Sequence, residues 1–227
     1  LLEIRPDQQE TRVDFAATDK LHGMRTVDVS TVRKHGKKLF YDRDGTTTQI
    51  RRIYNRVIFD ELLRKKPAME FGFFEELDVQ WVGHPNWYFR ISKHTLPFLK
   101  GHSVPYCRFI SDLGEPPADL QNFVLKPLYS FAGLGVDITP TREKIAAVSN
   151  PREWLLQRKV DYAPLLATPD GPAKAEVRLI LAGDGADWPR LMNKLVRLTK
   201  GAMHGVDYNR GRTWVGSSAG FHPVGAA

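Results

Sequence analysis

A lysine that ends a predicted strand and a loop that contains two glycines could together bind a polyphosphate. The stretch FVLKPLYSFAGLGVDI, residues 123–138, opens with apolar residues, places Lys126 at the end of that run and continues through Gly133 and Gly135. A cation fixed on a rigid strand can contact phosphate oxygens, and glycines let backbone N–H groups approach them. The spacing is not that of a Walker A loop, and Ile138 stands where a dinucleotide fingerprint would need its third glycine. These residues therefore indicate a phosphate site of another kind.

Three charged residues farther along the chain could complete such chemistry. Glu176 and Arg178 lie in AEVRLILA, and Arg197 lies in LMNKLVRLT, which are both predicted strands. Residues i and i+2 share one face of a strand, so Glu176 and Arg178 can form an ion pair or contact phosphates together. Arg197 could offset the charge of a phosphoryl group during its transfer, or it could face solvent. The sequence leaves these alternatives open.

The order of these pieces resembles the ATP-grasp superfamily, and within it the glutathione synthetase-like members. The stronger resemblance covers about residues 123–220 and is carried by VLKPLYSFAGLGV, LLQRKV, AEVRLILAGDG, NKLVRLTK and GVDYNRGRTWVGSSAG. Weaker similarity lies upstream, where RIYNRVIFDELL and HPNWYFRISKHTLPFL resemble the pre-ATP-grasp domain. Each motif alone has low specificity, so the resemblance depends on their order and spacing.

The resemblance implies a role for each matching residue. Lys126 would hold the α- and β-phosphates of ATP, and the loop that follows would close over the remaining phosphate. Glu176 and Arg178 would lie near the phosphates and the acyl intermediate, and Arg197 would stabilise the transferring phosphoryl group. The other implied ATP contacts are Ser130, Ala132, Gly133, Gly135, Gln157, Arg158 and Lys159, with Asp161 at the ribose. The family commonly has Gln-Glu in the hinge strand, whereas this chain has Gln157-Arg158.

The magnesium ion that the resemblance implies has a weak set of candidate ligands. ATP-grasp enzymes bind Mg²⁺ through an acidic residue and a Glu-x-Asn pair, and Mg²⁺ prefers oxygen ligands. Asp207 and Asn209 are the only late oxygen pair, and no Asp or Glu follows Asp207. The chain begins LLEI without an initiator methionine, so we expect a fragment that starts at a strand. The metal strand could then lie outside this sequence, as a permuted order would allow, or activity could be lost.

The predicted architecture is α/β (α+β). We expect a pre-ATP-grasp-like α/β substrate domain over 1–115 and an ATP-grasp domain of two small α+β subdomains over 120–227, because the turn-rich SDLGEPPADLQN (111–122) marks a boundary. The pattern predicts a βαβ unit over 1–29, a hairpin at Asp44-Gly45, a helix that Pro67 stops, and a helix from Ser92. Strands are predicted at 123–127, 135–138, 154–160, 175–182 and 191–199, with a helix capped by Thr139 after the second. The motif GSSAG at 216–220 satisfies G-x-S-x-G, but no acidic residue follows it, so a glycine turn is predicted.

Charge and composition set the remaining expectations. The net charge is +7, and basic residues cluster at 33–38, 51–56 and 64–66, which suits a polyanion or a solvated surface. Within the second cluster, Arg52 and Arg56 could contact a substrate carboxylate or phosphate. The single Cys107 excludes an internal disulfide and fits a reducing cytosol, so we expect a cytoplasmic protein. No apolar run approaches the roughly 20 residues that span a bilayer, so no membrane partner is expected.

These observations favour an ATP-dependent carboxylate–amine (or thiol) ligase that acts through an acylphosphate, with ATP and Mg²⁺ as cofactors and a small-molecule carboxylate and amine as substrates. The alternatives are a basic module that binds nucleic acid or another polyanion, a phosphotransferase on the same scaffold, and an inactive nucleotide binder. Nucleic acid is the disfavoured partner, because no RNA-binding signature accompanies the basic clusters. The sequence identifies neither the substrates nor the oligomeric state.

Overall fold

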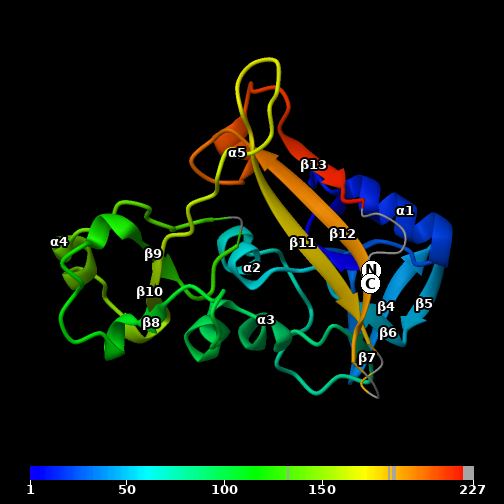
Figure 1. The fold of residues 1–227 in the computed structure, drawn as a ribbon. Coiled ribbons are helices and arrows are strands. Elements are labelled where there is room, and N and C mark those ends of the chain that lie inside the picture. Colours follow the sequence, from blue (N-terminus) through cyan, green and yellow to red (C-terminus); the bar gives the residue numbers. More distant parts are fainter. Residues whose placement is uncertain (132, 184, 186–187, 222–227) are drawn as a thin grey trace. The chain divides into compact units, whose positions relative to one another are not determined.

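A computed structural model describes residues 1–131, 133–183, 185 and 188–221, without the side chains of residues 206 and 207. The chain divides into two compact units (Figure 1): unit 1 comprises residues 1–131 and 135–157, and unit 2 comprises the described residues of 133–134 and 158–221. Both units combine small sheets with short helices, which confirms the mixed α/β class at a coarse level. The assignment of 1–115 and 120–227 to two family domains stays a prediction.

Unit 1 begins with the predicted βαβ unit. Strand β1 (Leu2–Glu3) pairs in parallel with β2 (Val27–Asp28), and α1 (Arg12–His22) connects them. Helix α1 ends at Gly23, whose φ of 60° suits glycine and whose N–H donates to the Asp19 carbonyl. Strands β6 (Arg52–Tyr54) and β7 (Gln80–Val82) form a second parallel pair, and a bridge from Leu2 to Asn55 links it to β1.

The predicted hairpin is present within an antiparallel sheet. Its strands are β3 (Arg33–His35), β4 (Lys38–Arg43) and β5 (Thr46–Ile50). Asp44 and Gly45 form the turn with positive φ values of 53° and 83°. Asp42 stabilises this turn, because its carboxylate accepts a 2.8 Å hydrogen bond from the Gly45 N–H. Helix α2 (Phe59–Lys65) follows and stops before Pro67, as predicted.

Short helices replace the longer helix that was predicted from Ser92. Helix α3 (Trp87–Arg90) is followed by a 3₁₀ segment, η3 (Lys93–Phe98), which Ser92 caps by accepting from the His94 N–H. Pro97 lies inside η3 and lacks the N–H that a continuing α-helix would need, which explains why the segment stays short. The other 3₁₀ segments of the unit are η1 (Pro6–Gln8), η2 (Val29–Thr31), η4 (Ile110–Asp112), η5 (Leu120–Asn122) and η6 (Pro151–Glu153).

The sheet that carries the predicted lysine consists of β8 (Cys107–Phe109), β10 (Trp154–Arg158) and β9 (Phe123–Pro127), in that spatial order. Strand β9 has the predicted bounds. The strand predicted at 135–138 is wrong in extent, because only Asp137 forms a bridge, to Leu125. Helix α4 (Arg142–Ala146) begins later than predicted, since Thr141 and not Thr139 accepts the capping hydrogen bond from the Lys144 N–H.

Two apolar cores support these elements of unit 1. The first lies under the parallel strands and the hairpin, and the second lies under β9 and β10. Members of the first are Leu2, Ile4, Val29, Val32, Leu39, Ile50, Ile53, Val57, Phe71 and Phe73. Members of the second are Leu113, Leu120, Phe123, Leu125, Ile145 and Leu156. Burial of β9 on this core makes the strand a rigid base for Lys126.

Unit 2 is built on an antiparallel sheet. Strands β11 (Lys174–Ala182), β12 (Arg190–Thr199) and β13 (Gly216–Ala219) lie in that order, and the short helix α5 (Val206–Asn209) lies between the last two in sequence. The glycine turn predicted for GSSAG is wrong, because its residues form β13 and pair with β12. Across the described residues, no helix has the length and apolarity that crossing a membrane requires.

Candidate functional site

Lys126 is held in a fixed position on the sheet of unit 1. It lies near the end of β9, and its Nζ donates a 2.6 Å hydrogen bond to Oε1 of Gln157 on the neighbouring strand β10. Burial lowers the pKa of Lys126, because the surroundings disfavour the charged form. The structure therefore brings together two residues that the sequence analysis assigned to the nucleotide.

Lys93 is a second cation near this position, and the sequence analysis missed it. Its Nζ donates to the Ser130 carbonyl at 2.6 Å, to the Ser130 hydroxyl at 3.1 Å and to the Leu128 carbonyl at 3.5 Å. Burial is the larger cause that lowers the pKa of Lys93, and the positive charge of Lys126 lowers it further. The only sequence feature that could have indicated Lys93 is its place one residue after the capping Ser92.

Lys93 and Lys126 form no ion pair among the described residues. The effect of Asp60 on the pKa of Lys93 is smaller than the effects of burial and of Lys126. Two half-buried ammonium groups close enough to repel each other favour an anion between or beside them.

Aromatic residues fix the start of the glycine loop. The Tyr88 hydroxyl donates a 2.6 Å hydrogen bond to the Tyr129 carbonyl, and the Tyr88 ring stacks on Phe131 with centroids 5.2 Å apart. Gly133 and Gly135 have φ values of 82° and 72°, so both use a backbone conformation that favours glycine. Ser130 belongs to this anchored start through Lys93, while Ala132 lies outside the described residues.

Cys107 lies beside the lysine but lacks the properties of a nucleophile. It is the register partner of Gln157, so it shares the neighbourhood of Lys126. Burial raises the pKa of the Cys107 thiol to about 11, so the thiol stays protonated near neutral pH. Cys107 therefore contributes a small, uncharged side chain to the surroundings of Lys126.

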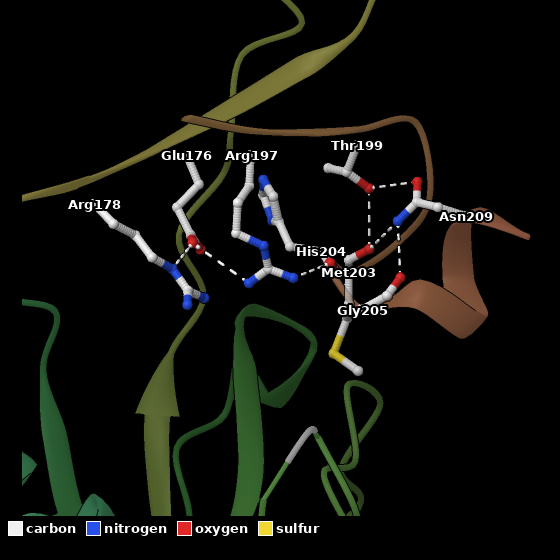
Figure 2. Close-up of polar contacts among 8 residues, drawn as sticks. All are labelled: Glu176, Arg178, Arg197, Thr199, Met203, His204, Gly205 and Asn209. Carbon is white, nitrogen blue, oxygen red and sulfur yellow. Dashed lines mark hydrogen bonds and ion pairs between the residues drawn. The ribbon is translucent and has the colours of Figure 1, made fainter. Parts of the chain in front are cut away.

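The predicted charged residues of unit 2 form one cluster (Figure 2). Glu176 and Arg197 are register partners on β11 and β12, and the Glu176 carboxylate lies 3.6 Å from the Arg197 guanidinium. The Arg178 Nε donates a 2.5 Å hydrogen bond to the same carboxylate oxygen. Burial, the largest effect, raises the pKa of Glu176, but the two arginines outweigh it and hold the pKa below its ordinary value. The cluster therefore holds one carboxylate and two guanidinium groups, which leaves a net positive charge.

His204 joins this cluster and was not predicted from the sequence. Its carbonyl accepts a hydrogen bond from Arg197 Nη2, and its ring meets Tyr162 edge to face at 4.8 Å. The His204 Nε2 atom is buried and has no hydrogen-bond partner among the described residues. Burial is the main cause that lowers the pKa of His204, so the ring is neutral near pH 7.

Asn209 fastens the segment that follows β12 (Figure 2). Its Oδ1 accepts hydrogen bonds from the Thr199 hydroxyl at 2.8 Å, which Figure 2 shows, and from two N–H groups that it does not draw, those of Lys200 at 3.0 Å and Gly201 at 3.1 Å. Its Nδ2 donates to the carbonyls of Met203 and Gly205, at 3.1 and 2.9 Å. Both polar atoms of this buried side chain are thus engaged by the loop.

The described residues do not provide an identifiable magnesium site. They contain no group of three or more His, Cys, Asp or Glu side chains that could hold a metal ion. The Asp207 side chain lies outside the described residues, and the Asn209 amide oxygen already accepts three hydrogen bonds. The role of this pair as metal ligands stays a prediction.

The remaining predicted site residues have separate surroundings. Arg158 is the exposed last residue of β10, and Lys159 and Asp161 follow it in unit 2. In unit 1, the Arg56 guanidinium lies over the Phe15 ring, 5.4 Å from its centroid, which is a packing contact. Arg52 lies on β6 and lines a hollow that does not include Arg56.

The first basic cluster, residues 33–38, is paired with an acidic segment. Arg33 Nη1 lies 3.0 Å from a Glu70 carboxylate oxygen. Two lysines of the cluster also form ion pairs, Lys34 with Glu75 and Lys37 with Glu76. Because these carboxylates offset the cluster's charge, its attraction for a polyanion is weakened.

Comparison with known proteins adds no relative to this description. No family model matches the chain, and no curated protein matches its sequence at a significant level.

Proposed function

We propose that the chain is an ATP-dependent carboxylate–amine (or thiol) ligase of the ATP-grasp type. The observation that carries the proposal is the pair Lys93 and Lys126, two partly buried ammonium groups without a carboxylate partner among the described residues. Lys93 also binds the Ser130 carbonyl at the start of the glycine loop, and Gly133 and Gly135 in that loop have a left-handed backbone conformation. A cation pair beside such a loop suits the phosphates of a nucleotide.

In the proposed reaction the protein positions reactants and stabilises charge. A carboxylate oxygen of the substrate attacks the γ-phosphorus of ATP, the bond from that phosphorus to the β-phosphate oxygen breaks, and ADP leaves with the acylphosphate formed. The amine or thiol then attacks the acyl carbon, loses its proton, and displaces inorganic phosphate. The family resemblance assigns Arg178 to the phosphates and Arg197 to the transferring phosphoryl group, and Glu176 neutralises only one of their two positive charges. Magnesium, when bound, would offset further phosphate charge.

The test is ADP release by the full chain with ATP, Mg²⁺ and a panel of small carboxylates and amines. Lys126→Ala and Lys93→Ala each remove a charged donor, and a charged hydrogen bond contributes about 1.5–3 kcal/mol. We expect ATP affinity to fall by about 10–100-fold in each variant. Lys100→Ala, which removes an exposed lysine elsewhere in unit 1, is the matched control and should behave as the unaltered protein. Substrate-dependent ADP release that persists unchanged in Lys126→Ala would refute the proposal.

The alternatives give different products or a different salt dependence. A phosphotransferase would use the same nucleotide contacts but release a stable phosphorylated product instead of an amide. An inactive nucleotide binder would bind ATP but show no turnover, and its ATP binding would be lost in the lysine variants. A polyanion-binding module would bind nucleic acid with an affinity that falls steeply as salt rises. The ion pairs of the 33–38 cluster argue against this last alternative.

A further inference from the structure

A small hollow in unit 1 is lined by arginines and by no acidic residue. Its volume is about 280 Å³, and it lies beside β2, the β4–β5 hairpin and the start of β6. The arginines that line it are Arg25, Arg43, Arg51 and Arg52. In the part of the chain that the structure describes, Arg25 is the one of these four that pairs with carboxylates, at 2.7 Å from Asp44 and 4.0 Å from Asp19. Positive charge therefore gathers here without a matching negative charge in the lining.

The other three arginines have guanidinium groups that are available to a ligand. Among the described residues, the side chains of Arg43, Arg51 and Arg52 take part in no ion pair and no hydrogen bond. Like charges that share a small space repel one another, and an anion bound there would relieve that repulsion. Arginine also presents a planar set of donors that matches a carboxylate in two parallel hydrogen bonds.

The rest of the lining favours an organic anion over an inorganic one. Tyr41 and Thr48 are register partners on the hairpin and share a strand face with Arg43, so their hydroxyls can support the same ligand. The lining also has an apolar surface, which includes the partly exposed side chains of Met24 and Val27. An ion with a hydrocarbon part would use both surfaces, whereas phosphate alone would use only the first.

We propose that this arginine hollow binds a small organic carboxylate. The volume of the hollow, about 280 Å³, is near the lower end of the roughly 300–1,000 Å³ that is typical of small-molecule sites, which suits a small ligand. A wider groove of about 850 Å³ shares Arg25, Val27, Tyr41 and Arg43 with the hollow, but it is also lined by Asp7, Asp19, Asp28, Asp42 and Asp44, so it suits only an uncharged extension of the ligand. Binding is independent of the nucleotide chemistry. Only the identification of this ligand as the carboxylate substrate rests on the proposed function.

The experiment measures binding to the full chain without nucleotide, by isothermal titration calorimetry. The probes are glutarate and hexanoate, the neutral amide glutaramide, inorganic phosphate and glycerol 3-phosphate. We expect saturable binding of at least one carboxylate and none of glutaramide. Arg43→Gln and Arg52→Gln should each weaken that binding by about 10-fold or more, since each removes a charged donor. Arg64→Gln, at an exposed arginine of α2 outside the hollow, should leave it unchanged.

Three results would overturn the inference: no saturable carboxylate binding, binding of the phosphates alone, or equal affinities in the hollow variants and Arg64→Gln. ATP binding measured on the same variants separates this inference from the proposed function. Retained ATP binding with lost carboxylate binding supports the hollow as a separate site. If the lysine variants leave ATP-dependent turnover unchanged, the proposed function fails, while a carboxylate bound through Arg43 and Arg52 still establishes the hollow.

Discussion

Replacement of Asn209 by alanine should loosen the segment between β12 and α5 far more than an ordinary surface substitution would. Asn209 is 8% exposed, and its side chain makes five hydrogen bonds, one to Thr199 at the end of β12 and four to that segment. Two of its partner groups, the Gly201 N–H and the Met203 carbonyl, also bond to the Thr199 hydroxyl. The substitution therefore removes about three hydrogen bonds without replacement. At about 0.5–1.5 kcal/mol each, the expected loss is about 2–4 kcal/mol.

Hydrogen exchange followed by mass spectrometry is the appropriate assay, because two units that unfold separately would not obey a two-state description. Peptides that cover residues 190–209 should exchange about 30- to 1,000-fold faster in Asn209→Ala, as follows from that energy. Peptides of unit 1 serve as an internal reference. Asn193→Ala is the matched control, because the exposed Asn193 accepts one short-range hydrogen bond, from the Lys194 N–H, and no other side-chain hydrogen bond with the described residues. Its effect should stay within about 0.5 kcal/mol.

The measurement in the presence of a chelator also addresses the predicted metal role. Asn209→Asp keeps an acceptor oxygen but removes both donated hydrogen bonds and adds a charge near two carbonyls. We therefore expect Asn209→Asp to be less stable than the unaltered protein even when a chelator removes metal ions, because its loss of hydrogen bonds does not depend on a metal. Equal exchange in Asn209→Ala and Asn193→Ala would refute the structural role argued here.

Two further predictions concern pH. The pKa of Glu70 is lowered mainly by a hydrogen bond from the Lys34 N–H, and that of Glu75 mainly by one from the Lys34 ammonium. Their contribution to stability is therefore present above the ordinary carboxyl pKa of 4.5 and lost as the pH falls through the lowered values. The protection factors of the amides in β3 and β4, which compare each measured exchange rate with the intrinsic rate at the same pH, should fall in acid. Glu70→Gln with Glu75→Gln should remove that decrease; an unchanged acid response in this double variant would contradict the pairing. Burial lowers the pKa of Lys126, and burial with repulsion from Lys126 lowers that of Lys93, so ATP affinity should decline with rising pH before the ordinary lysine value of 10.5 is reached. Affinity that stays constant up to that value, measured by calorimetry at pH values where the fold is intact, would argue against phosphate contact by these lysines.

Local sequence features predicted much of unit 1 because their causes are local. The turn at Asp44-Gly45 needs residues that accept positive φ, and the sequence supplies them next to each other. Strand β9 has the predicted bounds, since an apolar run ends there at a proline. The N-terminal cap of α4 was predicted at the wrong threonine. Asp137 already accepts hydrogen bonds from both the N–H and the hydroxyl of Thr139, which leaves the capping role to Thr141.

The residues that were missed depend on contacts between distant segments. The position of the Lys93 ammonium depends on hydrogen bonds to the carbonyls of Leu128 and Ser130. These residues are more than thirty positions away in the sequence, so the residues around Lys93 do not predict the contact. Residues Gly216–Ala219 form a strand because they pair with the edge of β12. The local sequence does not predict this pairing. The ion pair of Glu176 with Arg178 was one predicted alternative and is confirmed, because two-residue spacing on a strand is itself a local rule. The assignment of these residues to ATP stays a prediction.

Strand β11 has a practical consequence for anyone who produces unit 2 alone. It is an outer strand of its sheet, and its second edge pairs with no described strand. Its sequence, KAEVRLILA, is rich in branched aliphatic residues, and such an edge can template pairing with other chains. The charges at Lys174, Glu176 and Arg178 are its main protection against that pairing. Charge-removing variants of unit 2 alone should therefore be checked for solubility before any loss of binding is ascribed to the missing charge.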